Sequence, residues 1–183
     1  AAVAAGDYNN DGFSDLFIGS VTLGKHELLR NLGNGSFEPE KKTKEIFSSI
    51  QKVKIYSTSF FDFDNDGFLD LIIAGEPEEK EGRGLFLYHN DGKGNFADVS
   101  GLLPPEPKTG RQVAVFDYNE DGDLDLLIAG LNGGIYLLRN DGGNINHYVR
   151  MKLVGLRAGS AKNNHFGIGA KVEIRSGDLY QSM

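Results

Sequence analysis

Short apolar runs, separated by polar segments rich in glycine, recur through most of the chain. Runs of this length are typical of β-strands rather than helices. They form three groups, each with a first run before an acidic loop, a second run directly after that loop, and a third run before a turn. The first runs are 1–5, 59–61 and 113–116, the second are 16–19, 71–75 and 126–130, and the third are 27–30, 85–88 and 135–138. Because the second runs are continuously apolar, we expect those strands to be covered on both faces.

Each third run ends at a turn built from asparagine and glycine, at 31–35, 90–94 and 140–143. Asn-Gly and Asp-Gly pairs supply the positive φ angles that tight hairpins need. A short fourth strand is expected to begin at Phe37 and at Phe96, and the third copy diverges after its turn. The pattern therefore predicts an all-β protein with three four-stranded antiparallel units, at about 1–54, 55–110 and 111–144.

Three acidic loops join the first and second strands of these units and begin 55 residues apart, at Asp7, Asp62 and Asp117. Oxygen-bearing side chains recur at loop positions 1, 3, 5 and 9, with glycine at position 6. These side chains are Asp7, Asn9, Asp11 and Asp15, then Asp62, Asp64, Asp66 and Asp70, then Asp117, Asn119, Asp121 and Asp125. A hard cation that takes six to eight oxygen ligands needs such a loop, with a sharp turn that lets the chain wrap the ion. The loops therefore predict three calcium sites, and Mg²⁺ fits less well because it prefers rigid octahedral sites that keep several waters.

The fixed spacing of the loops indicates a repeat architecture. A four-stranded sheet that is apolar on both faces cannot stand alone, and stacking such sheets radially gives a β-propeller. Propellers close with about four to eight blades. Three units are too few to close a ring, so we expect the chain to be a fragment of a larger propeller, with further blades before Ala1.

Composition narrows the classes of function. The formal net charge is −7, which argues against a nucleic-acid partner, because such a partner requires a basic surface. Ten of the 26 acidic residues are the loop side chains, so the negative excess is local and bound cations would neutralise it. Cysteine is absent, which excludes disulfides and thiolate metal sites. No apolar run approaches the length of a transmembrane span.

The helical EF-hand is the obvious competing calcium motif, and its loop needs a bidentate glutamate at position 12. Position 12 is occupied here by Ile18, Ile73 and Ile128, and the flanking runs are strand-like. The pattern therefore excludes an EF-hand. The aspartate at position 9 is the last ligand of each loop.

The loops, each followed by an apolar strand, resemble the FG-GAP and VCBS repeats of the kind found in the integrin α-subunit β-propeller. The resemblance covers about residues 1–144. It implies that each Ca²⁺ is bound by the four side chains already named and by the backbone carbonyl of position 7. Those carbonyls belong to Phe13, Phe68 and Asp123. Asn9 and Asn119 stand where aspartate is common, so the charge falls by one while the oxygen remains.

The remaining residues, 145–183, carry two further alternating segments. Val149, Met151 and Leu153 alternate with other residues in one, as do residues 170, 172 and 174 in the other, so both are expected to be half-buried strands. Segments 146–155 and 163–174 resemble a truncated ASPIC/UnbV module, which follows such blades in the cartilage acidic protein family.

Two polar insertions, 38–54 and 76–83, are expected to be solvated loops, with partner binding as the alternative. The residues give no case for an enzyme: the four histidines share no pattern, no Gly-x-Ser-x-Gly motif occurs, and the aspartates belong to the loops. Asn34 starts a glycosylation sequon, but it also lies in a predicted turn.

The sequence thus favours a calcium-stabilised propeller that is secreted, periplasmic or on the cell surface. Its expected role is adhesion or assembly through other proteins, surface glycans or copies of itself. The alternative is the propeller scaffold of a secreted carbohydrate-active enzyme, a lyase or hydrolase, whose active site lies outside these residues.

Overall fold

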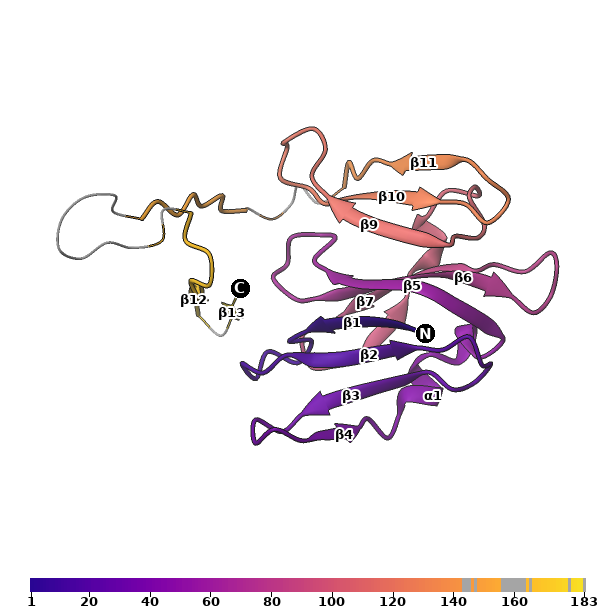
Figure 1. Ribbon diagram of the computed structural model, residues 1–183, viewed down its shortest axis with the longest axis horizontal. Helices are drawn as coiled ribbons and strands as arrows, with labels where there is room; N and C mark the ends of the chain where they lie inside the picture. Colours follow the sequence, from indigo (N-terminus) through magenta and orange to yellow (C-terminus); the bar gives the residue numbers. More distant parts are fainter. Residues whose placement is uncertain (143–145, 147, 156–163, 165, 178, 183) are drawn as a thin grey trace.

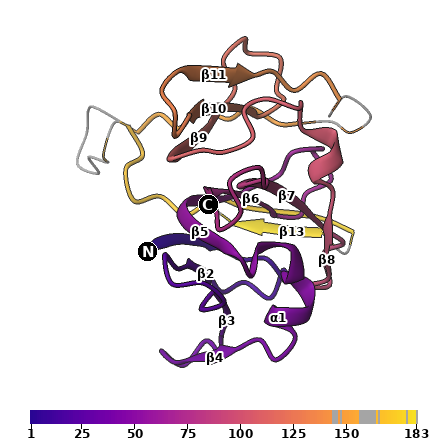
Figure 2. The ribbon, with the colours of Figure 1, turned by 90° about the vertical axis from the view of Figure 1, so that its right-hand side faces the viewer.

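The computed structural model describes residues 1–142, 146, 148–155, 164, 166–177 and 179–182. Three antiparallel sheets are stacked on one another (Figures 1 and 2). Sheet one contains β1 (Ala2–Gly6), β2 (Asp15–Gly19), β3 (Glu27–Asn31) and β4 (Phe37–Pro39). Sheet two contains β5 (Val53–Phe61), β6 (Asp70–Pro77), β7 (Leu85–Asn90) and β8 (Phe96–Asp98). Sheet three contains β9 (Gln112–Phe116), β10 (Asp125–Ala129) and β11 (Ile135–Leu138).

The all-β prediction is confirmed, and the strands of each sheet pair with their neighbours in chain order. Sheets one and two have the expected four strands. Sheet three has three strands within the described part of the chain, and residues 143–145 and 147, at the end of its turn and after it, lie outside that part.

The first strands of the three sheets lie side by side, with β1 against β5 and β5 against β9. Because each sheet then extends outward in strand order, the three sheets fan out from these inner strands (Figure 1). This is the arrangement of neighbouring blades in a propeller.

Sheet two is buried on both faces. Along β6, Leu71 and Ile73 pack into a core shared with sheet one, whereas Ile72 and Ala74 pack into a core shared with sheet three. All four side chains are fully buried. Successive residues of a strand face opposite sides of the sheet. The second run is therefore continuously apolar because both faces of the sheet are covered, as the sequence predicted.

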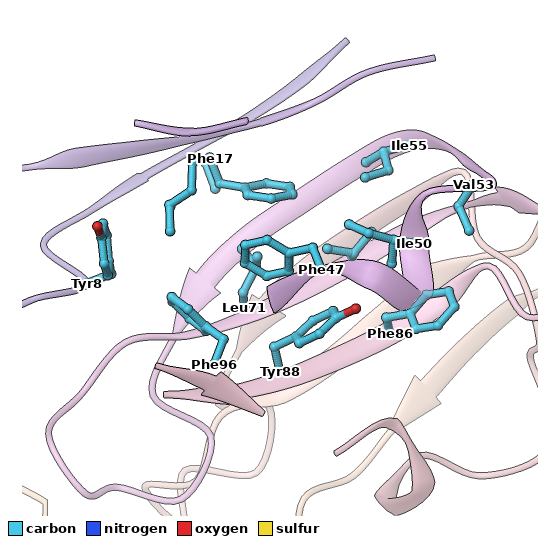
Figure 3. Close-up of a cluster of buried hydrophobic side chains, with 13 residues drawn as sticks. Tyr8, Phe17, Phe47, Ile50, Val53, Ile55, Leu71, Phe86, Tyr88 and Phe96 are labelled. Atoms are coloured by element: carbon cyan, nitrogen blue, oxygen red, sulfur yellow. The ribbon is translucent and has the colours of Figure 1, made fainter. Parts of the chain in front are cut away.

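The first polar insertion is only partly a solvated loop, which corrects the prediction. It contains a helical turn, α1 (Thr43–Ile46), and a 3₁₀ turn, η1 (Ser48–Ile50), and it buries Phe47 and Ile50 completely in the core between sheets one and two. The Phe47 ring lies 5.2 Å from that of Phe17 and 4.9 Å from that of Tyr88, centroid to centroid (Figure 3). The sequence pattern does not reveal the burial of these two residues, because charged residues surround them and most of their neighbours in the sequence are exposed.

The second insertion begins within a strand, since β6 continues to Pro77. A 3₁₀ turn, η2 (Ser100–Leu102), follows β8 and lies against β7. Among the described residues, no helix is long and apolar enough to cross a membrane.

The tail differs from its predicted pattern. Residues 148–155 form no strand, and Val149 is 72% exposed. Alternation of apolar residues needs a partner surface, and no described strand pairs with this segment. The later prediction is met in part, because β12 (Glu173–Ser176) pairs with β13 (Leu179–Ser182) to form a hairpin beside the stacked sheets (Figure 1).

Candidate metal centre

All three acidic loops lie at the same end of the stacked sheets, where the first strand of each sheet turns into the second (Figure 1). They share one backbone conformation. Position 4 has a positive φ in each loop, 63° at Asn10, 57° at Asn65 and 63° at Glu120. The glycine at position 6 has φ values of 90°, 92° and 95° in the three loops. A side chain would be strained at the φ angles of position 6, so the path of the chain explains why glycine occupies that position in all three loops.

The first aspartate of each loop stabilises the bend of the loop by accepting a backbone hydrogen bond. Its Oδ2 atom accepts a hydrogen bond from the position 6 N–H, at 2.7 Å for Asp7, 2.8 Å for Asp62 and 3.0 Å for Asp117. The aspartate at position 5 similarly accepts the N–H of position 7, at 3.0 Å, 2.8 Å and 3.0 Å. The carboxylate oxygens of the loop that do not accept these hydrogen bonds remain available to a cation.

The aspartate at position 9 connects the loop to the third strand. Asp15, Asp70 and Asp125 are completely buried, and Oδ1 of each accepts the backbone N–H of the asparagine that begins the turn after the third run. In sheets two and three, Oδ2 also accepts the N–H of loop position 2, at 3.0 Å. Position 9 therefore holds the loop together in addition to its predicted role as a ligand.

Burial makes the charged form of several loop carboxylates unfavourable. It raises the pKa of Asp70 to about 8, and it raises the pKa values of Asp62 and Asp15 to about 6. Burial also raises the pKa of Asp66, to which the neighbouring Asp64 adds. A bound cation would offset this cost, since it favours the ionised form of each ligand.

The donor set of loop two fits a hard cation. Carboxylate oxygens of Asp62, Asp64 and Asp70 lie within 4.8 Å of one another. The Nε2 atom of His89 also lies 3.3 Å from Asp64 Oδ2 and 3.5 Å from Asp66 Oδ2. Loop three offers buried oxygens that lack a hydrogen-bond partner, Asp117 Oδ1 and Asp123 Oδ2. Loops one and three form no group of three acidic or histidine ligands at this spacing among the described residues, because asparagine replaces aspartate at their third position.

The comparison with protein families agrees with the sheets and loops. The model of the FG-GAP-like repeat matches residues 7–73 and again residues 62–128. The chain belongs to the FG-GAP-like repeat family.

Integrin alpha chains share this similarity. The chain is 33% identical to integrin alpha-4 of Xenopus laevis over 134 residues, which cover 69% of this chain and 13% of that protein. It is 27% identical to integrin alpha-3 of Mus musculus over 155 residues, which cover 76% of this chain and 14% of the relative. The matched region is thus a small part of the integrin alpha chains.

Sequence reasoning missed the role of an asparagine at or just after the end of the third strand of each FG-GAP-like repeat. Asn90 is completely buried, and its Nδ2 donates to the backbone carbonyl of Leu69 in its own sheet, at 3.0 Å, and to that of Tyr8 in loop one, at 2.7 Å. Asn140 bonds in the same way to Leu124 and to Phe63 of loop two, at 3.4 Å and 2.6 Å. Each of these asparagines therefore connects a sheet to the metal loop of the preceding repeat. Its recurrence in the sequence is the available signal, and turn formation accounts for only part of its role.

Loop three of the FG-GAP-like repeats has neighbours that the other loops lack. The Arg150 guanidinium lies 3.0 Å from Asp117 and 3.4 Å from Glu120. The side chain of Asp123, predicted to contribute only its carbonyl, is 1% exposed and accepts a 2.8 Å hydrogen bond from Asn65 of loop two. Loops two and three are therefore directly joined.

Proposed function

We propose that this protein is a calcium-binding, extracellular or cell-surface propeller that mediates adhesion or other protein contacts, with Ca²⁺ in a structural role. The convergence of Asp62, Asp64 and Asp70 within 4.8 Å is the observation that carries the proposal. The shared backbone conformation extends the proposal to loops one and three.

Each ion would be held by the side chains at positions 1, 3, 5 and 9 and the carbonyl at position 7. The proposed ligands are Asp7, Asn9, Asp11, Phe13 and Asp15; Asp62, Asp64, Asp66, Phe68 and Asp70; and Asp117, Asn119, Asp121, Asp123 and Asp125. Bound calcium supplies positive charge among the carboxylates. Oxygen-only donors suit Ca²⁺. The loop residues would hold the ion between the first and second strands of each sheet and so fix these strands relative to one another.

The expected affinity supports an extracellular, periplasmic or surface location. Modules of this kind bind Ca²⁺ with dissociation constants of about 10⁻⁴–10⁻³ M. At roughly 2 mM free Ca²⁺, each site would then stabilise the fold by about 0.7–1.8 kcal/mol. Cytosolic free calcium is too low to fill such sites.

The proposed partners are proteins or surface glycans, and similarity to integrin alpha chains supports a contact role. At the end of β6 remote from the loops, a cavity of about 430 Å³ is lined by polar residues of the second insertion and by Tyr136. This end of the sheets offers a contact surface that the metal loops leave free. We also propose that 145–183 begins a separate ASPIC/UnbV-like module, and the β12–β13 hairpin supports a β fold for part of it.

The variant Asp64→Ala tests the calcium proposal. In 2 mM Ca²⁺ we expect it to lose the stabilisation of one site, about 0.7–1.8 kcal/mol. In chelator it should be as stable as the parent or more so, because it removes a negative charge from a crowded loop. Glu79→Gln is the matched control, since it removes one exposed charge outside the loops and should have the same small effect in both conditions.

Thermal melts with Ca²⁺ and with chelator, and calorimetric titration with Ca²⁺, provide the measurements. Equal melting midpoints for the parent protein in the two conditions would contradict a structural role for calcium. The contact role is tested separately, by measuring whether beads coated with the protein attach to cells or to immobilised glycans, with beads coated by heat-unfolded protein as the control.

A further inference from the structure

A hydrogen bond between side chains joins loops two and three directly. The Nδ2 atom of Asn65 donates to Oδ1 of Asp123, at 2.8 Å. Two residues earlier in loop two, the carbonyl of Phe63 accepts the Asn140 side chain, at 2.6 Å. The Asn140 bond has a counterpart between loops one and two, formed by Asn90. Loop two is thus bonded to repeat three at two of its first four positions.

The bond between Asn65 and Asp123 links the backbone of two proposed cation sites. Asn65 occupies position 4 of loop two, directly between the proposed ligands Asp64 and Asp66. Asp123 occupies position 7 of loop three, and its backbone carbonyl is a proposed ligand of that loop. Its side chain is held inside the protein, since the residue is only 1% exposed. A displacement of Asn65 therefore bears directly on the position of a ligand in the next loop.

The corresponding residues of loops one and two cannot form this bond. Asn10 occupies position 4 of loop one in the same left-handed conformation as Asn65, with φ values of 63° and 57°. Position 7 of loop two, however, is Phe68, whose side chain has no oxygen to accept a hydrogen bond. The Phe68 ring lies instead against Gly92 in the turn of its own sheet. The chain therefore contains one pair of adjacent loops with the asparagine–aspartate contact and one pair without it.

We propose that Asn65 and Asp123 are positioning residues that couple the cation sites of loops two and three, so that occupation of one site strengthens binding at the other. The inference rests on the calcium sites proposed above. When loop two is occupied, the backbone on both sides of Asn65 is held, and Asn65 in turn holds Asp123 in place. Loop three then loses less conformational freedom on binding, which gives positive cooperativity. The coupling is reciprocal.

Charge acts against this coupling and sets the conditions of the experiment. A cation in loop two reduces the negative potential that attracts a second cation to loop three. Four carboxylates and one divalent cation nevertheless leave loop two with a net charge of −2, so it still attracts cations. Interactions between exposed charges are largely screened beyond about 8 Å at 0.15 M salt. At this ionic strength we expect the hydrogen-bonded coupling to exceed the loss of attraction.

Calorimetric titration of the 183-residue protein with Ca²⁺ at 0.15 M salt measures the coupling. All proteins carry Asp11→Ala, which removes a ligand of loop one and leaves two sites. Asp64→Ala then leaves only loop three, and Asp121→Ala leaves only loop two. The coupling ratio is the product of the two association constants when both sites are intact, divided by the product of the two constants measured singly. We expect a ratio of about five or more.

Variants of the connecting pair show whether this bond carries the coupling. Asn65→Ala and Asp123→Ala should each bring the ratio to within about twofold of one, and the two changes together should have no further effect, because both remove the same bond. Asn10→Ala is the matched control, since it removes an amide at the same position of a loop, and it should leave the ratio unchanged. A single cooperative melt in chelator verifies that each variant is folded.

The possible failures of the two proposals are distinguishable. Independent filling of the two sites in the protein with Asn65 and Asp123 intact would overturn the coupling, and so would an Asn65→Ala variant that keeps the full ratio. Both results require Ca²⁺ to bind to loops two and three, so they leave the calcium proposal intact. A protein that shows neither binding heat nor a shift of its melting midpoint with Ca²⁺ would contradict the calcium proposal itself.

Discussion

Sheets two and three are built from the same repeat, yet they have very different surroundings. Sheet two is covered on both faces, and its Leu85 and Leu87 are nearly completely buried. Ile135 and Leu137 occupy the corresponding positions of sheet three and are largely exposed. A repeat of this kind therefore gains its stability from its neighbours rather than from its own sheet.

The outer strand extends the contrast. In sheet two, β8 places Phe96 in the core shared with sheet one. Beside the outer strand of sheet three, a cavity of about 410 Å³ is lined by Phe63, Leu103, Leu138 and other mainly apolar residues. Phe63, which lines this cavity, is the counterpart of Tyr8, whose ring lies against that of Phe96 in the junction between sheets one and two. Among the described residues, the junction between sheets two and three is thus less completely filled than the junction between sheets one and two.

Truncating leucines at corresponding positions of sheets two and three should give the largest difference in unfolding free energy. Leu87→Ala removes a 4% exposed side chain between sheets two and three and should cost about 2–5 kcal/mol of unfolding free energy. Leu137→Ala should cost less than about 1 kcal/mol in dilute, monomeric protein, since surface changes have small effects. Urea denaturation measures both. Similar costs would show that the two sheets depend equally on their apolar residues.

The connecting asparagines should give the next largest effect. Asn90→Ala leaves the carbonyls of Tyr8 and Leu69 without a donor and should cost about 1–3 kcal/mol. Asn31→Ala is the matched control, because its Nδ2 donates to Ser14 of its own sheet alone among the described residues. It should cost about 1 kcal/mol or less in the monomer. If both variants lose equal stability, the bond to the preceding loop has no energetic importance.

Titration of the loops tests the comparison through pH rather than through a substitution. The raised pKa values mean that the folded protein holds these protons more tightly than the unfolded chain. The associated stability is therefore complete below pH 3.8 and is lost as the pH rises through about 6 for Asp62 and about 8 for Asp70. In chelator, unfolding free energy from these groups should fall over this range, and Ca²⁺ should reduce the fall.

Buried His26 acts in the opposite direction and must be separated from the loops. Its Nδ1 accepts the Ser20 N–H and its Nε2 donates to the Ile50 carbonyl, both at 3.1 Å. Burial lowers its pKa below 6.5, so its contribution is present above that pH and is lost as the pH falls. The difference between urea midpoints with and without Ca²⁺ at each pH removes the His26 contribution. A difference that is constant from pH 4 to pH 8 would contradict the assignment to the loops.

Local patterns predicted the strands and the loops well, because each depends on residues that are close in the sequence. The apolar runs fall within or beside strands in all three sheets, and every loop carries its positive φ at the predicted glycine. Contacts between repeats could not be predicted from local patterns, because they join residues that are far apart in the sequence. Phe47 is buried by sheets that form from distant residues, and Asn90 finds its partner in another repeat. The segment that contains Val149 has the predicted alternation, but no strand among the described residues pairs with it.

The recurring asparagine also bears on how such a chain could have arisen. A single duplicated stretch of about 55 residues carries a whole junction, since it brings its own asparagine at one end and its own accepting carbonyl at the other. A newly duplicated repeat can therefore form this hydrogen bond with the repeat it was copied from, without any further mutation. Lengthening by gene duplication requires no invention of a new interface, which favours descent of all three repeats from one ancestral segment.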